Sequence, residues 1–357
     1  MKHKVVQEEK QKGKPKPKAE KTLVDQVTDS VKARSRPMVK MLSTNITTLD
    51  LALGGGLPLG QISNFVGDSS SGKTFLACEC IFAAKTILKD KLEWFYDDVE
   101  NRFSFDTKKL YGFDIVKKDQ VNSLTIEDFS NNLKSRLAKL KEGKTLIYVL
   151  DSFDALSSEA EIKRDEKEKE SGTYNLEKVK AIGQFFRLRK GDIKESNCIL
   201  IIISQVRENI GVMFGARYYR TGGKALDHSA TVIMWLAEVE KHKKKHLAYG
   251  ISTKCKLTKV GVDKPFRECI INVIFDRGVD DVAGNILYLY DLYTERGQRK
   301  EKLEKEIIEW EGKEYSFREL IQHIENNNLE DVLAQKVIDK WNEIEDSISS
   351  RNRKARW

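Results

Sequence analysis

The chain has 357 residues and a formal net charge of +8, and 40% of its residues are hydrophobic. This length allows one large domain with appendages, or two domains. The chain has no run of eighteen apolar residues, and no apolar segment follows its basic N-terminus. The sequence therefore predicts neither a membrane span nor a secretory signal.

The cysteines indicate packing rather than metal binding. None forms a C-x-x-C pair, and none has metal-ligand spacing with a histidine. Most lie in apolar runs, which favours reduced, buried thiols and a reducing, cytoplasmic compartment. The five are Cys78, Cys80, Cys198, Cys255 and Cys269.

The first 40 residues carry most of the positive charge, with twelve Lys/Arg against five Asp/Glu. Residues 1–21 are rich in Lys, Gln and Pro, so we expect disorder there. A short helix is expected within 22–39, ending before Pro37. A basic arm of this kind either holds nucleic acid electrostatically or acts as a solvated arm, and its composition fits both.

The segment G-D-S-S-S-G-K-T at 67–74 fits the phosphate-binding P-loop pattern G-x-x-x-x-G-K-[S/T]. A short buried strand is expected before it at 62–66 and a helix after it at 75–88, which is the context that the pattern requires. Glycines at both ends let backbone N–H groups point at a polyphosphate, and the helix N-terminus adds partial positive charge. The predicted nucleotide contacts are Gly67, Asp68, Ser69, Ser70, Ser71, Gly72, Lys73, Thr74 and Phe75.

Two of these residues have specific predicted roles. Lys73 supplies a positive charge to the β- and γ-phosphates, and the hydroxyl of Thr74 is placed to ligate Mg²⁺.

Strands and helices are expected to alternate after this loop. The expected strands are 92–96, 145–150 and 198–203, and the expected helices are 126–141 and 175–189. This alternation predicts a parallel α/β sheet, and the continuous apolar runs of the strands indicate that both of its faces are covered.

Three later segments, at 230–236, 251–258 and 268–275, are expected strands with no long helical stretch between them. They predict an antiparallel extension of the sheet. From residue 298 the chain is charged and helix-prone, with an aromatic-containing segment at 310–315. We therefore expect an α/β fold with a mainly parallel central sheet. It is divided into a basic N-terminal arm at 1–40, a core at 41–297 and a small helical C-terminal domain at 298–357.

Polar side chains follow the expected strands. Asp151 comes directly after one strand, where a P-loop nucleotidase places the carboxylate that meets the magnesium hydration shell. Ligands of open parallel sheets bind at the carboxyl ends of strands, and the same rule applies to Asp98, Glu100 and Gln205. An attacking water needs a carboxylate near it to act as general base. We predict that Glu100 has this role, and Asp98 is the nearest alternative. Gln205 is uncharged and able to hydrogen-bond a γ-phosphate.

The region around Gln205 carries a more specific pattern. Residues 203–215 (ISQVRENIGVMFG) and 221–226 (TGGKAL) resemble the second DNA-binding loop of the RecA family of bacterial and phage homologous recombinases. Residues 42–62 (LSTNITTLDLALGGGLPLGQI), V-L-D-S at 149–152 and K-P-F at 264–266 are also similar to that family.

The resemblance implies a RecA-like ATPase that binds ATP and Mg²⁺, hydrolyses ATP through Glu100 and senses the γ-phosphate through Gln205. It also implies a helical filament of this chain on single-stranded DNA, with ATP between neighbouring subunits, and pairing with homologous double-stranded DNA. Lys259 falls on one of two lysine positions with which the family reaches across that interface, whereas the other holds Gly261. The residues implied to bind DNA are Lys180, Arg187, Arg207, Gly211, Met213, Phe214, Arg217, Arg220, Gly222 and Gly223.

Three further segments have expected contacts with DNA or with a neighbouring subunit. The first DNA-binding loop of the family corresponds to 157–174, which is longer and more charged here than the usual form. The run K-H-K-K-K-H at 241–246 either touches a second DNA strand or forms a solvated hairpin tip. A recombinase of this kind uses a segment such as 22–39 to dock on a neighbouring subunit.

The leading interpretation is a DNA-stimulated ATPase that promotes homologous pairing and strand exchange, in a bacterial cell or a phage that infects one. Two other functions stay open. One is a RecA-like module that binds ATP and DNA without exchanging strands, and the other is a hexameric helicase motor with the same core. The segment 211–226 argues against a helicase, which does not need it in this form.

Overall fold

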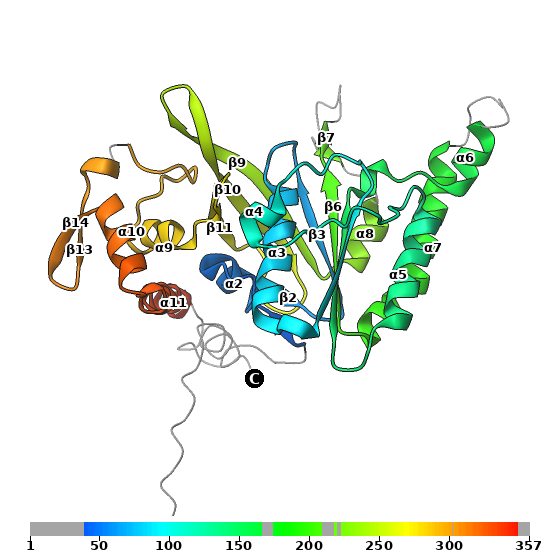
Figure 1. The fold of residues 1–357 in the computed structure, drawn as a ribbon, viewed down its shortest axis with the longest axis horizontal. Helices are drawn as coiled ribbons and strands as arrows, with labels where there is room; N and C mark the ends of the chain where they lie inside the picture. Colours follow the sequence, from blue (N-terminus) through cyan, green and yellow to red (C-terminus); the bar gives the residue numbers. More distant parts are fainter. Residues whose placement is uncertain (1–38, 166–173, 209–217, 220–222, 302, 349–357) are drawn as a thin grey trace, which may run out of the picture.

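The computed structural model describes residues 39–165, 174–208, 218–219, 223–301 and 303–348. Its centre is an eight-stranded sheet in the order β12-β11-β10-β9-β3-β6-β5-β4 (Figure 1). The parallel strands are β3 (Gln61–Gly67), β4 (Leu92–Asp98), β5 (Thr145–Asp151), β6 (Cys198–Gln205) and β9 (Val232–Lys244). The antiparallel strands are β10 (Leu247–Val260), β11 (Glu268–Ile274) and β12 (Gly278–Val279).

The predicted α/β sheet with an antiparallel extension is therefore confirmed, with one difference. The strand expected at 230–236 is the start of β9, which runs parallel to β3 and antiparallel to β10. Strand β9 therefore joins the parallel half of the sheet to its antiparallel half. Helix α8 (Gly223–Ser229) precedes β9 and lies in the crossover from β6 that makes a parallel strand possible. The sequence analysis did not predict this short helix.

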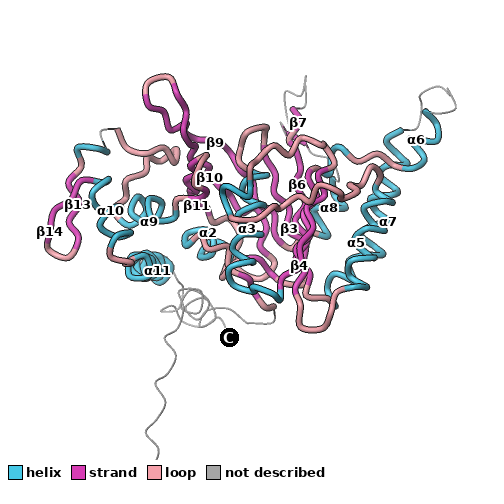
Figure 2. Tube along the Cα trace, in the orientation of Figure 1, coloured by secondary structure: helices cyan, strands magenta, loops and turns pink. Residues whose placement is uncertain are grey.

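Apolar residues alternate between the two faces of the central strands. In β6, Ile199, Ile201 and Ile203 belong to one buried cluster, whereas Leu200 and Ile202 belong to the other. Since successive strand side chains point to opposite faces, a fully apolar strand needs cover on both. That cover is visible in Figures 1 and 2.

Helices α2 (Thr47–Leu53), α3 (Lys73–Leu88) and α4 (Thr107–Tyr111) cover one face. Helices α5 (Ile126–Lys139), α7 (Tyr174–Glu195) and α8 cover the other. Helix α5 begins with a capping box, in which the Thr125 side chain accepts from the N–H of Asp128 and the Asp128 carboxylate accepts from the N–H of Thr125.

Short elements complete the core. Strand β1 (Met41–Leu42) pairs with β2 (Leu57–Pro58), and β7 (Arg207–Glu208) pairs with β8 (Tyr218–Tyr219). The remaining short helices are η1 (Lys89–Lys91), η2 (Phe153–Ala155), α6 (Glu159–Asp165) and η3 (Leu303–Lys305).

The C-terminal region contains the expected helices, α10 (Phe317–Asn326) and α11 (Glu330–Ser347), but they follow a β-hairpin. The hairpin consists of β13 (Ile307–Trp310) and β14 (Lys313–Ser316), so the aromatic segment at 310–315 spans its turn. Its Trp310 shares a buried cluster with Ile286 and Leu287 of α9 (Asp281–Leu289). The proposed boundary at residue 298 stays a prediction, and this cluster contains residues from both sides of it.

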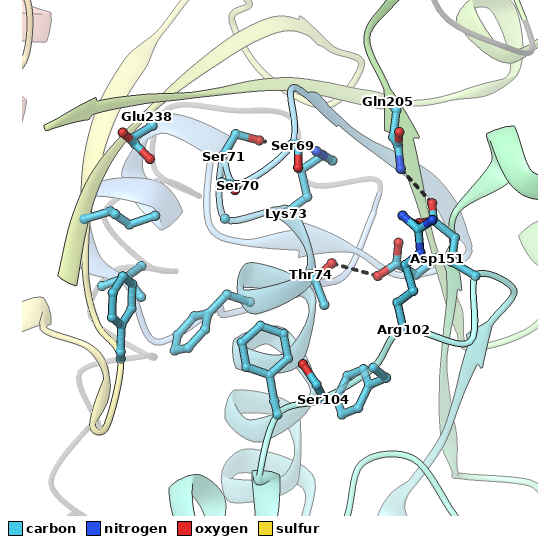
Figure 3. A pocket seen from close by; sticks show the side chains of 18 of the residues that line it. Ser69, Ser70, Ser71, Lys73, Thr74, Arg102, Ser104, Asp151, Gln205 and Glu238 are labelled. Carbon is cyan, nitrogen blue, oxygen red and sulfur yellow. Dashed lines mark hydrogen bonds and ion pairs between the residues drawn. The ribbon is translucent and has the colours of Figure 1, made fainter. Parts of the chain in front are cut away.

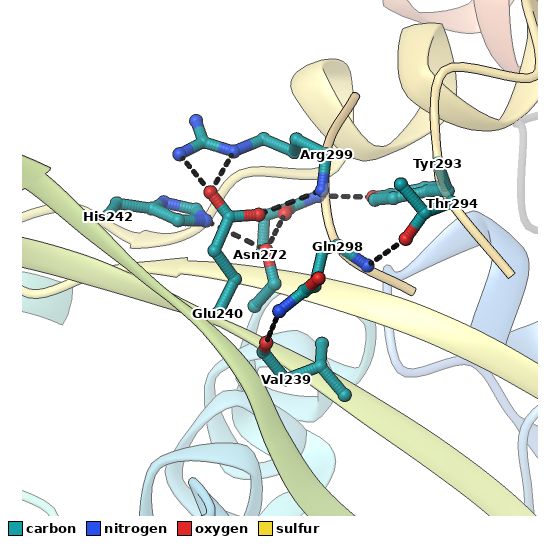
Figure 4. Close-up of polar contacts among 9 residues, drawn as sticks. Val239, Glu240, His242, Asn272, Tyr293, Thr294, Gln298 and Arg299 are labelled. Carbon is teal, nitrogen blue, oxygen red and sulfur yellow. Dashed lines mark hydrogen bonds and ion pairs between the residues drawn. The ribbon is translucent and has the colours of Figure 1, made fainter. Parts of the chain in front are cut away.

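A polar network ties the segment before the hairpin to the antiparallel strands (Figure 4). Arg299 donates to Glu240 at 2.7 Å, and Gln298 donates to the carbonyl of Val239 at 3.0 Å. His242, expected as part of a basic run, is buried here, and its Nε2 lies 2.7 Å from the Ser252 hydroxyl. Burial, aided by the positive charge of Arg299, lowers the pKa of His242 to about 4, so this histidine adds no charge to the lysines of the hairpin.

The cysteines and the helix compositions agree with the expectations from the sequence. All five cysteines are buried and unpaired with one another, as packing residues should be. Among the helices in the described part of the chain, none has both the length and the apolarity needed to cross a bilayer.

Candidate nucleotide and DNA site

A cavity of about 760 Å³ opens at the carboxyl ends of the parallel strands (Figure 3). The P-loop forms one wall, and Glu100, Asp151 and Gln205 reach it from the ends of neighbouring strands. This volume lies within the usual range for a small-molecule site. The structure thus brings these three side chains together with residues 69–75 of the predicted nucleotide contacts, whereas Gly67 and Asp68 do not line the cavity.

The P-loop needs glycine at two positions for steric reasons. A Cβ at Gly67 would lie 2.4 Å from the carbonyl oxygen of Leu236 on the adjacent strand. Gly72 has φ = +88°, a left-handed conformation that favours glycine, immediately before α3 starts at Lys73. This backbone directs the N-terminus of α3 at the cavity, where an anion is stabilised.

Lys73 is the buried cation of the cavity. Its Nζ donates to the carbonyl oxygens of Gly67 at 2.8 Å and Asp68 at 2.5 Å. Burial lowers the pKa of Lys73, while the carboxylates of Asp151 and Asp68 oppose that change. A desolvated ammonium of this kind gains most from an anionic partner such as a phosphate oxygen.

Thr74 and Asp151 supply adjacent oxygen atoms. The Thr74 hydroxyl donates to Asp151 Oδ2 at 2.8 Å, and the buried Tyr96 hydroxyl donates to the same oxygen at 2.6 Å. Burial raises the pKa of Asp151, and these two hydrogen bonds oppose it, whereas the nearby Glu100 carboxylate raises it further. A hydroxyl beside a crowded group of carboxylates is a donor set that suits Mg²⁺, so Thr74 and Asp151 fit the predicted metal role.

Glu100 is a half-buried carboxylate that lines this cavity. Its Oε1 accepts from Ser152 Oγ at 2.5 Å and from Gln205 Nε2 at 2.6 Å, and Arg102 lies 3.6 Å from its Oε2. The rival, Asp98, instead accepts the backbone N–H groups of Arg102 and Phe103. Asp98 therefore has a structural role in the turn, and the geometry favours Glu100 as the base.

The other half of the cavity is apolar, and of the residues named here only Phe75 was predicted to contact the nucleotide. Phe75 packs edge-on against Phe105 with ring centroids 5.9 Å apart, and Phe103 lies next to Phe105 at 5.7 Å. Ile251 of β10 and Phe275, which directly follows β11, also line the cavity. This surface suits a flat, largely apolar group such as a nucleobase. In the sequence, the two phenylalanines Phe103 and Phe105 were the pattern that could have indicated this apolar surface.

The predicted DNA contacts are only partly described. Lys180 and Arg187 are exposed on α7, seven residues apart and hence on one face. Arg207 starts β7, directly after the strand that ends at Gln205, and Gly223 is the first residue of α8. Gly211, Met213, Phe214, Arg217, Arg220 and Gly222 lie outside the described residues. So do the predicted N-terminal arm up to residue 38 and residues 166–173 of the predicted first DNA-binding loop.

Lys259 does not line the cavity in its own subunit. It lies near the end of β10, and its Nζ donates to the carbonyl oxygen of Asp227 at 2.6 Å, at the C-terminal end of α8. This contact gives Lys259 a structural role within one subunit, which competes with the role predicted across the interface.

Comparison with known proteins decides the family. The family model for the RecA N-terminal domain matches residues 18–280. A Protein RecA of Trichodesmium erythraeum is 31% identical over 288 residues, which cover 80% of this chain and 72% of the relative. The Protein RecA of Clostridioides difficile is 30% identical over 246 residues (69% and 68%), and that of Chloroherpeton thalassium is 33% identical over 263 residues (72% and 69%). The chain belongs to the RecA family.

Membership confirms the resemblance read from the sequence. As a RecA family protein, the chain is an ATP-dependent DNA recombinase and a DNA-dependent ATPase that uses ATP and Mg²⁺, binds DNA and forms filaments. The cavity fits this chemistry, because a P-loop, a hydroxyl–carboxylate pair and a candidate general base meet in it.

Proposed function

We propose that this RecA family protein assembles as a helical filament on single-stranded DNA, with ATP between adjacent subunits, and then pairs the strand with homologous double-stranded DNA. The observation that carries the proposal is the contact of Gln205 with Glu100 at 2.6 Å. Gln205 is the last residue of β6, and the chain continues directly into the predicted DNA-binding loop at 207–220. A change at the γ-phosphate end of the cavity therefore reaches the DNA loop through one continuous stretch of backbone.

The proposed mechanism assigns one task to each side chain. Lys73 leaves the loop carbonyls for the β- and γ-phosphate oxygens, and Glu100, oriented by Ser152, takes a proton from the attacking water. Thr74 and Asp151 would hold Mg²⁺, which would supply positive charge to neutralise the phosphates. Gln205 exchanges its bond to Glu100 for one to the γ-phosphate, which frees the carboxylate and moves the start of the DNA loop.

Replacing Gln205 by alanine tests this coupling. Gln205→Ala is expected to keep basal DNA binding but to lose the gain in DNA affinity that ATP produces, because no side chain then joins the phosphate to the loop. The measurement is a titration of single-stranded DNA with and without a non-hydrolysable ATP analogue, with Gln205→Glu as a size-matched control. An undiminished gain in Gln205→Ala would contradict the mechanism.

Lys259 is proposed to act on the ATP of a neighbouring subunit. Lys259→Ala alone should then reduce ATPase activity on DNA, and so should Lys73→Ala alone. A mixture of the two should recover part of the activity, at junctions where an intact Lys259 faces an intact P-loop. If Lys259 serves only its own α8, as its bond to the Asp227 carbonyl permits, the mixture stays as inactive as its parents.

The bacterial origin of the relatives and the five unpaired, buried cysteines support action in the cytoplasm, of a bacterium or of a cell that a phage has infected.

A further inference from the structure

The turn between β10 and β11 presents an aromatic side chain in an unfavourable backbone conformation. Phe266 is 73% exposed and has φ = +68°, which is rare for a bulky residue. The turn is held at its base, where the N–H of Phe266 donates to the carbonyl of Leu257 at 2.7 Å and the N–H of Leu257 donates to the carbonyl of Arg267 at 2.9 Å. Such strain persists only where the surroundings fix it, and it often marks a functional surface.

The surroundings that fix this turn come from the far end of the chain. Arg267 donates to Asp263 Oδ2 and to Glu345 Oε1, both at 2.6 Å, and Lys264 donates to the other oxygen of the same carboxylate, Glu345 Oε2, at 2.5 Å. Glu345, on α11, thus bridges both cations of the turn. The side chains of Arg267, Asp263 and Glu345 are 11–14% exposed, so solvent screens these pairs little.

Arg267 also anchors the turn to the body of the subunit. Its Nη1 donates to the carbonyl of Leu51 in α2 at 3.3 Å, and its guanidinium lies 5.8 Å from the ring centre of Trp341 in α11. Although burial raises the pKa of Glu345, the bonds and charges of Lys264 and Arg267 outweigh it and hold that pKa below its usual range. Glu345 is therefore charged at neutral pH and keeps both cations engaged.

We propose that α11, through Glu345, holds the turn at 261–267 in the form that docks on a second copy of this chain, which makes Glu345 a positioning residue for assembly-dependent ATP hydrolysis. This inference rests on the filament of the proposed function and adds a role for the C-terminal region in it. Lys259 lies two residues before the turn on β10, so a displaced turn also displaces that lysine.

The test compares two substitutions on α11. Glu345→Gln removes the negative charge that bridges Lys264 and Arg267 and leaves one acceptor oxygen for two cations. Lys340→Gln instead removes an anchor of α11 to Asp291 and to the carbonyls of Tyr288 and Leu289, none of which belongs to the turn. Both should lower the melting temperature by a few degrees. The measured quantity that decides the test is the protein concentration that gives half-maximal ATPase activity on excess single-stranded DNA.

We expect Glu345→Gln to raise that concentration about tenfold, the scale of one charge-assisted hydrogen bond, and Lys340→Gln to leave it within about twofold. Basal ATPase activity without DNA should not change in either variant. Phe266→Ala should raise the same concentration, and adding Glu345→Gln to it should have no further effect, since both act on one surface.

Equal half-maximal concentrations for Glu345→Gln and Lys340→Gln would overturn the positioning role, and so would additive effects in the double variant. If the wild-type ATPase activity on DNA does not depend on protein concentration at all, the proposed assembly itself is wrong, and the positioning role is rejected with it.

Discussion

Glu100→Gln is expected to reduce ATP turnover by about 10²-fold or more while ATP and single-stranded DNA still bind, the usual scale for loss of a general base. Glutamine keeps the size of the side chain and still accepts the hydrogen bond from Ser152, so the cavity should keep its shape. It cannot take a proton from water, however. Steady-state turnover and nucleotide affinity, measured on the same preparation, separate these two effects.

Asp98→Asn is the matched control for this prediction. Asp98 receives two backbone N–H groups of its own turn, so the asparagine should disturb the turn and lower stability, with a smaller loss of turnover than Glu100→Gln. If Glu100→Gln turns over normally and Asp98→Asn does not, the general base is Asp98.

Lys73→Ala is expected to abolish ATP hydrolysis and most nucleotide affinity. The substitution removes a buried cation whose Nζ lies 2.8 Å from the carbonyl oxygen of Gly67 in the P-loop. The charge proposed to meet the phosphates is lost with it. Titration of a fluorescent ATP analogue measures the affinity directly. Lys85→Ala on the same helix is the control, because Lys85 lies over Trp94 and does not line the cavity. Wild-type affinity in Lys73→Ala would contradict the assigned role.

The sequence predicted the parts of the molecule that depend on local pattern. The P-loop between a strand and a helix, the apolar strands at 145–150 and 198–203, and the meeting of Asp151 with Thr74 all follow from spacing and from the rule that ligands bind at carboxyl strand ends. Glu100 and Gln205 could be placed at one edge in the same way, but their direct contact could not. That contact depends on the registers of β4 with β5 and of β5 with β6, and on the turn that Asp98 stabilises.

Other features depend on tertiary packing, which a single sequence does not express. The apolar wall draws Phe75 and Phe105 from one region and Phe275 from another, about 170 residues away along the chain. Tyr96 reads as an ordinary strand residue until the fold places its hydroxyl on Asp151. The hairpin at 307–316 was missed because its charged strands are short and only their inward-facing residues, Ile308 and Trp310, are buried.

Electron microscopy of the protein with single-stranded DNA and a non-hydrolysable ATP analogue tests the central claim most directly. The proposed function predicts continuous helical filaments that form on the DNA and are lost when the analogue is omitted or when Lys73→Ala replaces the wild type. Closed hexameric rings would indicate a helicase-type motor, and DNA-bound protein without regular assembly would indicate a binding module. Either of these results would contradict the proposed ATP-dependent filament.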